Sequence, residues 1–286
     1  MFKMKHLLVI GLVFSSVLSI SAQRPNPINN SQKGQFYFYW GWNYSGYTKS
    51  NISFSGDDYN FELKKVKAND RQSDFDANVY LNPANMTIPQ YNFRMGYFIN
   101  NTYNISFGID HMKYVVNTGQ EVTIDGCISE IGNPFLGEYA NDKIVLSPDF
   151  LKYEHTDGLN YVNVELRRLD KLWKNEKVSF NLVTGLGAGI CLPKTNVTLM
   201  GGPRNDEFHL AGFGMSGVAG LNIRFLKYLF IQTEIKGGYL NLPDVLTTPS
   251  DSDKASQQFG FIQVNAVFGA QFQLTKPRKR ALTPKF

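Results

Sequence analysis

The chain has 286 residues, of which 43% are hydrophobic and 14% aromatic, so a sizeable core is possible. Its formal net charge of +5 falls to +3 once Lys3 and Lys5 are removed with a leader segment, which is too small to indicate a nucleic-acid partner. Two cysteines exclude a disulfide framework and a zinc site. No apolar run after the N-terminus reaches the ~18 residues that a membrane-spanning helix needs.

The N-terminus has the layout of a targeting segment. Two lysines precede an apolar stretch at residues 7–18, and Ala22 offers a cleavage point. We predict that residues 1–22 are a cleaved signal peptide, so that the mature chain leaves the cytoplasm. A polar lead-in without periodicity follows at residues 23–34.

The next part of the chain contains four predicted strands. In each of them apolar and polar residues alternate, which is the pattern of a strand with two different faces. They lie near residues 36–45, 91–99, 103–110 and 161–167, and the first is the most aromatic. The intervening residues 46–89 and 117–157 are polar and are predicted as long loops, with a small hairpin near 59–66 outside the main sheet.

Four longer runs with the same alternation occupy residues 178–274. In the third run, for example, Ile231 and Ile235 lie on the face opposite to Glu234. Long polar connections are predicted near residues 191–210 and 241–257, and a very short turn near Leu226 and Lys227.

The eight runs are separated by connections that alternate between long and short. A soluble sandwich has no reason to alternate in this way, whereas an outer-membrane barrel has long extracellular loops and short periplasmic turns. The sequence therefore predicts an all-β fold, an eight-stranded antiparallel transmembrane β-barrel at residues 35–274, with a basic periplasmic tail at 275–286. Both termini then lie in the periplasm, and a secreted sandwich is the alternative.

The architecture resembles the small outer-membrane proteins of the OmpA, OmpX and OmpW kind, and the Asn-, Tyr- and Lys-rich sequence resembles the barrels of Bacteroidetes. The last run, residues 268–274, is similar to the signal that barrel-insertion machinery reads, with Gly269, Phe272 and Leu274 at the matching positions. Phe268 departs from the polar residue that usually opens this pattern. The resemblance implies a location in the outer membrane of a Gram-negative cell, and the insertion machinery as a partner.

Inward-facing parity predicts a polar network in the lumen. Four basic and three acidic groups nearly balance, which favours a filled, cross-linked core over a pore lined by the same charges. Two of them, Arg94 and Asp110, sit on neighbouring strands at heights that suit a pair. The predicted network comprises Arg94, Asp110, Glu165, Arg167, Arg224, Glu234 and Lys236.

Candidates for chemistry are few. His155 and Asp157 lie together where a long loop re-enters the barrel, and a histidine beside a carboxylate invites an acyl-transfer interpretation. Their spacing does not match lipid A-modifying barrel enzymes, so we predict no catalytic site, no cofactor and no metal. Cys127 and Cys191 both map to the loop side and form a possible disulfide.

The sequence thus predicts a non-enzymatic outer-membrane barrel of structural, adhesion or accessory type. The alternatives are a narrow, porin-like channel for small solutes and a lipid A-modifying enzyme. The expected partners are membrane lipid, lipopolysaccharide and an unidentified extracellular or membrane partner, with no nucleic acid.

Overall fold

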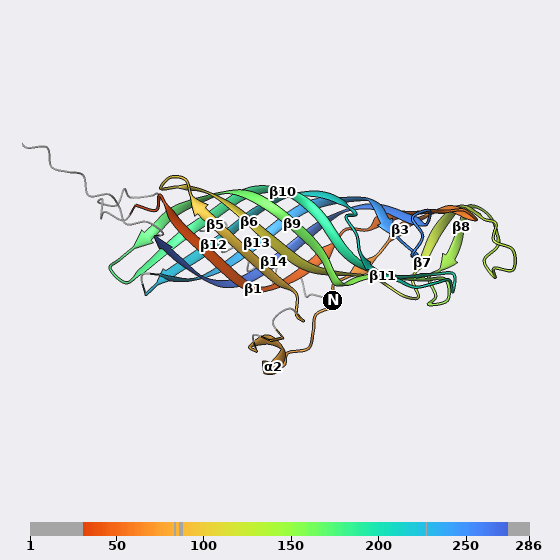
Figure 1. The fold of residues 1–286 in the computed structure, drawn as a ribbon, viewed down its shortest axis with the longest axis horizontal. Coiled ribbons are helices and arrows are strands. Elements are labelled where there is room, and N and C mark those ends of the chain that lie inside the picture. Colours follow the sequence, from red (N-terminus) through yellow and green to blue (C-terminus); the bar gives the residue numbers. More distant parts are fainter. Residues whose placement is uncertain (1–30, 83, 86–87, 227, 274–286) are drawn as a thin grey trace, which may run out of the picture. The chain divides into compact units, whose positions relative to one another are not determined.

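The computed structural model describes residues 31–82, 84–85, 88–226 and 228–273, and from Gln32 onward they belong to one compact unit (Figure 1). The predicted signal peptide at 1–22, most of the lead-in and the basic tail at 275–286 lie outside the described residues. Among the residues that the structure describes, no helix is long and apolar enough to cross a membrane.

Eight antiparallel strands follow one another around a closed sheet, as the alternation predicts. Closure comes from β1 and β14, which pair from Gln35 opposite Gln273 to Tyr47 opposite Phe261. Closing the sheet leaves no unpaired edge in this part of the chain, which is the condition for a sheet that spans a bilayer. In ring order the strands are β1 (Gln35–Tyr47), β5 (Tyr91–Phe98), β6 (Tyr103–Val116), β9 (Leu151–Lys174), β10 (Val178–Leu199), β12 (Gly212–Phe225), β13 (Leu229–Leu246) and β14 (Lys254–Gln273).

Three tight turns lie at one end of the ring, called here the turn end, where β1 also begins and β14 ends. Asparagine makes two of them: the Asn100 side-chain oxygen accepts hydrogen bonds from the backbone N–H of Thr102 and Tyr103, each at 2.8 Å. Asn175 does the same in the turn between β9 and β10. Asparagine suits such positions because its short side chain replaces a backbone partner.

The opposite end, called here the loop end, is more structured than the sequence predicts. The predicted hairpin near 59–66 is present, but the segments predicted as loops at 117–157, 191–210 and 241–257 are largely strand. The sheet continues from β14 through β2 (Ser50–Gly56), β3 (Tyr59–Val66), β7 (Glu121–Ile128) and β8 (Gly137–Val145), while β11 (Asn205–Phe208) pairs with β10 and β4 (Ala68–Asn69) with β6.

These segments were predicted as loops because the inward-facing side chains change from polar to apolar along a strand, although the same alternate positions keep facing inward. Near the turn end of β13, inward positions such as Glu234 and Lys236 are charged and outward positions such as Ile231 are apolar. Further along the same strand the inward positions are Leu240 and Leu242, both fully buried. A pattern of polar residues inside and apolar residues outside therefore becomes the pattern of a water-soluble sheet without any break in the strand.

Two surfaces follow from this change. The belt is the ring of exposed apolar side chains on the outside of the turn-end part, including Phe38, Met95, Ile105, Phe107, Val164, Leu166, Leu186, Phe213, Ile231, Ile262, Val264 and Phe268. The loop-end core is the buried apolar cluster beyond the belt, including Ile52, Phe54, Phe61, Leu63, Tyr114, Ile124, Phe150, Tyr153, Cys191, Leu240, Leu242 and Phe259. The belt can be covered by lipid, and the loop-end core is covered by its own sheet, so neither apolar surface has to face water.

Candidate functional site

Six of the seven charged residues predicted for the lumen meet in one cluster, which we call the charged layer. They come from four strands: Arg94 on β5, Asp110 on β6, Glu165 and Arg167 on β9, and Glu234 and Lys236 on β13. Each of the six is at most 2% exposed. The inward parity of their strands brings them to one level of the ring, where charges must pair because no bulk water reaches them.

Glu165 is the centre of this layer. Its Oε1 atom lies 2.9 Å from Nη2 of Arg94 and 2.6 Å from Nζ of Lys236. Its other oxygen accepts from Nε of Arg167. The carboxylate thus contacts three buried cations and offsets part of their positive charge, as buried charges require.

The remaining two carboxylates complete the pairing. Arg167 reaches across the lumen to Glu234, and Lys236 also contacts Asp110. The pair expected from sequence, Arg94 with Asp110, is present only as a long contact of 3.9 Å. Three cations face three anions, so the formal charges of the layer balance.

Neutral polar groups fill the spaces between the charges. Asn163 accepts from Nη2 of Arg94 at 2.7 Å and donates to Asp110 at 2.9 Å. The Tyr39 hydroxyl accepts from Nε of Arg94 at 3.2 Å and from Nη2 of Arg167 at 3.0 Å. Because side chains of opposite walls bond to each other, the layer crosses the whole lumen.

Asn92 and Ser106 belong to this network but were not among the residues predicted for it. Asn92 donates to Asp110 and, at 3.1 Å, to Gln263. Ser106 accepts from Nη1 of Arg94 at 3.1 Å. Both have the inward parity of their strands, so the same rule that found Arg94 could have found them.

Arg224, the seventh residue predicted for the lumen network, lies outside the charged layer. It lies on β12 opposite Phe230, whereas Glu234 lies opposite Gly220, four residues closer to the loop end. At this level Arg224 bonds to the side chain of Gln271 and has no carboxylate partner among the described residues. The alternation along β12 correctly predicts that Arg224 faces inward. Its height in the barrel depends on the register between neighbouring strands, which the sequence does not give.

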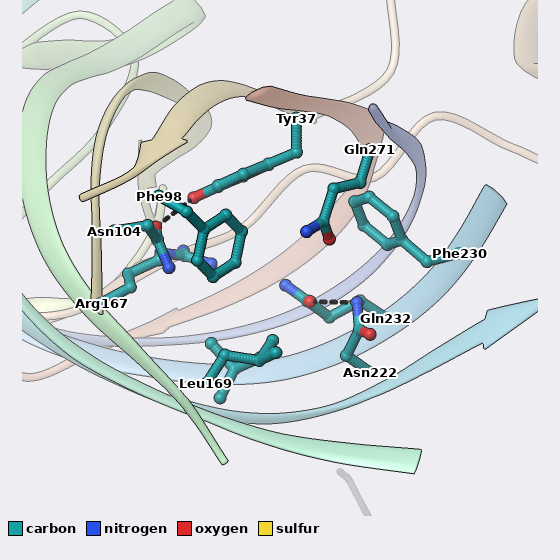
Figure 2. Close-up of a pocket in the computed structure, with 10 residues that line it drawn as sticks. Tyr37, Phe98, Asn104, Arg167, Leu169, Asn222, Phe230, Gln232 and Gln271 are labelled. Carbon is teal, nitrogen blue, oxygen red and sulfur yellow. Dashed lines mark hydrogen bonds between the residues drawn. The ribbon is translucent and has the colours of Figure 1, made fainter. Parts of the chain in front are cut away.

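A small cavity separates the charged layer from the turn end (Figure 2). Its volume is about 20 Å³, room for roughly one water molecule. Side-chain hydrogen bonds line it, with Tyr37 donating to Asn104 at 2.8 Å and Asn222 to Gln232 at 2.8 Å, as the dashed lines in Figure 2 show. Aromatic and aliphatic side chains, Phe98, Leu169 and Phe230 among them, close the remaining sides. The cavity therefore has the size of a single solvent site.

The structure does not bring the two catalytic candidates together. His155 is fully buried in the loop-end part, where its Nδ1 atom lies 3.0 Å from Oγ1 of Thr195. Asp157 is on the surface and pairs with Lys194 at 3.0 Å. Burial lowers the pKa of His155 to about 3, so the imidazole is neutral and serves packing.

One histidine–carboxylate pair was not singled out from the sequence. Nε2 of His209 lies 2.9 Å from Asp244, which also pairs with Lys254 at 2.8 Å. The three come from distant segments at the loop-end surface, so no local motif announces them. Within the described residues there is no group of three or more His, Cys, Asp or Glu side chains that could hold a metal ion.

The possible disulfide is not formed. Cys191 and Cys127 are both free, the first buried and the second exposed. Cys191 sits on β10 opposite Tyr161 and Gly212, inside the barrel wall, whereas Cys127 lies on β7 between Asn60 and Glu138. Both belong to the loop end, but they lie on strands that are far apart in the sheet, Cys191 buried and Cys127 exposed.

No family model and no curated protein matches the sequence. Solved structures match the fold. The outer membrane protein OprG of Pseudomonas aeruginosa is 9% identical, with a TM-score of 0.39, covering 85% of this chain and 97% of its own. AlkL, an outer membrane protein studied in lipid bilayers, is 9% identical with a TM-score of 0.39, covering 91% and 100%. The attachment invasion locus protein Ail of Yersinia pestis is 11% identical with a TM-score of 0.29, covering 84% and 99%. The chain is thus similar to small outer-membrane β-barrel proteins.

Proposed function

We propose that this chain is an outer-membrane β-barrel of structural, adhesion or accessory type, which acts through its surfaces and not through its lumen. The observation that carries the proposal is the charged layer. Its charges balance, each member is buried, and its side chains bond across the lumen between opposite walls. In a barrel of eight strands such a layer fills the interior, because little space remains between the walls.

The loop-end core supports the same proposal, because it is a second barrier in series with the first. Leu240 and Leu242 on β13, Phe259 on β14 and Tyr114 on β6 point into the space beyond the charged layer. An ion leaving the layer would have to cross a packed apolar region, where its hydration could not be replaced.

The sheet beyond the belt supports a role in surface contacts. Strands β2, β3, β7 and β8 extend from the ring (Figure 1) and are packed on the loop-end core. Residues on β8 are mostly exposed, and Ile131, in the connection between β7 and β8, is 97% exposed. In the proposed orientation the turn end faces the periplasm, and this sheet faces outward toward an unidentified partner.

Planar-bilayer recording tests the closed lumen. Purified wild-type protein is expected to give no stable unit conductance, because both barriers block ions. A porin reconstituted in the same lipid serves as the positive control. A reproducible unit conductance that changes when Lys236 is replaced would place the conduction path through the charged layer and contradict the proposal.

Cell-binding measurements test the outward surface. We expect the double substitution Ile131→Asp and Leu136→Asp to lower attachment of expressing cells several-fold, because both side chains are exposed at 97% and 55% beside β8. Val145→Asp, at the far end of β8, is the matched control for adding a charge to an exposed apolar position. A belt position such as Val164 is unsuitable as a control, because a charge there would hinder membrane insertion. Equal attachment by all three proteins would show that this hairpin is not the contact surface.

A further inference from the structure

In the segment between β4 and β5, residues 70–90, several apolar side chains of the described residues are largely exposed. Phe75 is 80% exposed, Leu81 67% and Ile88 49%. Its short helix α2 (Ala77–Tyr80) has no buried residue. A helix of one turn is marginally stable in water, and exposed apolar residues on both sides of it are typical of a contact surface.

Both ends of the segment are fixed to the barrel. The Asp70 carboxylate accepts a hydrogen bond from the backbone N–H of Ser45 on β1 at 2.7 Å. At the other end, Lys113 on β6 donates from Nζ to the carbonyl of Ile88 at 3.0 Å and from its backbone N–H to Gln90 at 2.8 Å. The segment is therefore held against a defined part of the wall.

That part of the wall is the belt. The Tyr80 ring lies 6.0 Å from Trp42, whose own ring is 4.9 Å from Trp40 and 6.2 Å from Phe268. Trp42 pairs with Tyr91 and Ala266 within the ring of strands. In Figure 1, α2 projects from the ring of strands on the side of β1, away from β7 and β8.

Several polar groups of the segment bond to one another. Asp76 caps α2 by accepting from the backbone N–H of Asn78 at 2.7 Å, and Tyr80 donates to the Ser73 carbonyl at 2.7 Å. Asn85 donates to the Asn78 carbonyl at 3.0 Å. Such internal bonds lower the cost of placing part of the segment against acyl chains, which offer no partners to polar groups.

We propose that the described residues 70–82 and 88–90 form an in-plane lipid anchor, whose apolar side chains insert into the loop-end leaflet beside the belt. The inference rests on the proposed function, since it requires that the belt faces lipid. Lipid is the expected partner because the exposed side chains continue the belt through the contact of Tyr80 with Trp42. Asp74 and Asp76 flank Phe75, so the segment lies at the level of the headgroups and the first acyl carbons, where carboxylates can stay hydrated.

Spin-label accessibility in phosphatidylcholine vesicles tests the anchor. Single cysteines replace Phe75 and Leu81 in a Cys127→Ser background, where the buried Cys191 stays unlabelled. Labels at 75 and 81 are expected to collide with oxygen several-fold more often, relative to a water-soluble nickel complex, than a label at Ile131→Cys. Ile131 is the aqueous control, being 97% exposed and remote from the belt, and Ile262→Cys, 57% exposed in the belt, is the lipid control.

The two controls separate the two possible failures. A water-like label at position 262 would overturn the proposed membrane barrel itself. A lipid-like label at 262 together with labels at 75 and 81 as water-accessible as that at 131 would overturn the anchor alone, including the case in which a protein partner covers the segment in cells. A lipid-like response at both 75 and 81 supports the anchor.

Discussion

Replacing Lys236 with methionine is expected to lower the free energy of unfolding by about 3–5 kcal/mol, because it leaves three buried carboxylates facing only two buried cations. Nζ of Lys236 contacts Asp110 and lies 2.6 Å from Glu165, and all three side chains are at most 3% exposed. Reversible urea unfolding in lipid vesicles, followed by heat-modifiable gel mobility, measures the change.

Two variants show whether the effect comes from uncompensated charge. The double substitution Lys236→Met and Asp110→Asn restores the balance of two cations and two anions, so it should recover more than half of the lost stability. Lys143→Met is the matched control: its ion pair with Glu121 spans 3.6 Å between side chains that are 65% and 61% exposed, and such pairs contribute about 1 kcal/mol or less. Equal effects of Lys236→Met and Lys143→Met would mean that the charged layer is open to water.

The ring of strands was predictable because its evidence is local. Each strand between its turns keeps one parity, so the side on which Glu165 or Glu234 lies can be read from its neighbours along the chain. The alternation of short and long connections then gives the number of strands and their antiparallel order. None of this requires knowledge of which residues meet across the lumen.

Partners within the charged layer depend on register and could not be predicted in the same way. Arg94 has Asp110 on the adjacent strand, yet its closer carboxylate is Glu165, on β9, at 2.9 Å instead of 3.9 Å. Arg224 has the right parity but the wrong height. Strands tilt as a barrel closes, so residues at one level are offset along the sequence by an amount that alternation does not reveal.

The loop-end core was missed because the meaning of the pattern changes along a strand. On β9, Glu165 points inward within the belt, and Tyr153 and Leu151 point inward beyond it. A prediction that expects polar residues inside assigns the second part to a loop. The physical cause is the surrounding medium: lipid outside requires apolar outward residues, whereas water outside requires an apolar interior.

Acidification is expected to open the loop-end core through His155. Its pKa is about 3 in the folded protein because of burial, against a usual value near 6.5, so the open form binds the extra proton between these two pH values. The stability from the neutral imidazole is therefore fully present above about pH 6.5 and is lost as the pH falls below it. At pH 4.5 the difference amounts to about 100-fold in the population of the open form.

Cys191 reports this opening, since its thiol is fully buried in the same core. In a Cys127→Ser background, its reaction with 4,4′-dithiodipyridine is measured at pH 7.5 and 4.5 for the wild-type residue at position 155 and for His155→Gln. Glutamine can bond to Thr195 but cannot take up a proton. The rate for the protein with His155 divided by the rate for His155→Gln should therefore be about 100-fold higher at pH 4.5 than at pH 7.5.

The ratio isolates His155 from the other groups that titrate in this range. Tyr114 and Tyr153 contact its ring at 5.7 and 5.2 Å, Gln257 lies 3.5 Å from Nε2, and none of these takes up a proton between pH 7.5 and 4.5. Glu154 bonds instead to Asn196 and Arg71 and is the same in both proteins. A ratio that does not change with pH would show that the core accommodates the imidazolium, and hence that water reaches the region where the second barrier of the lumen is placed.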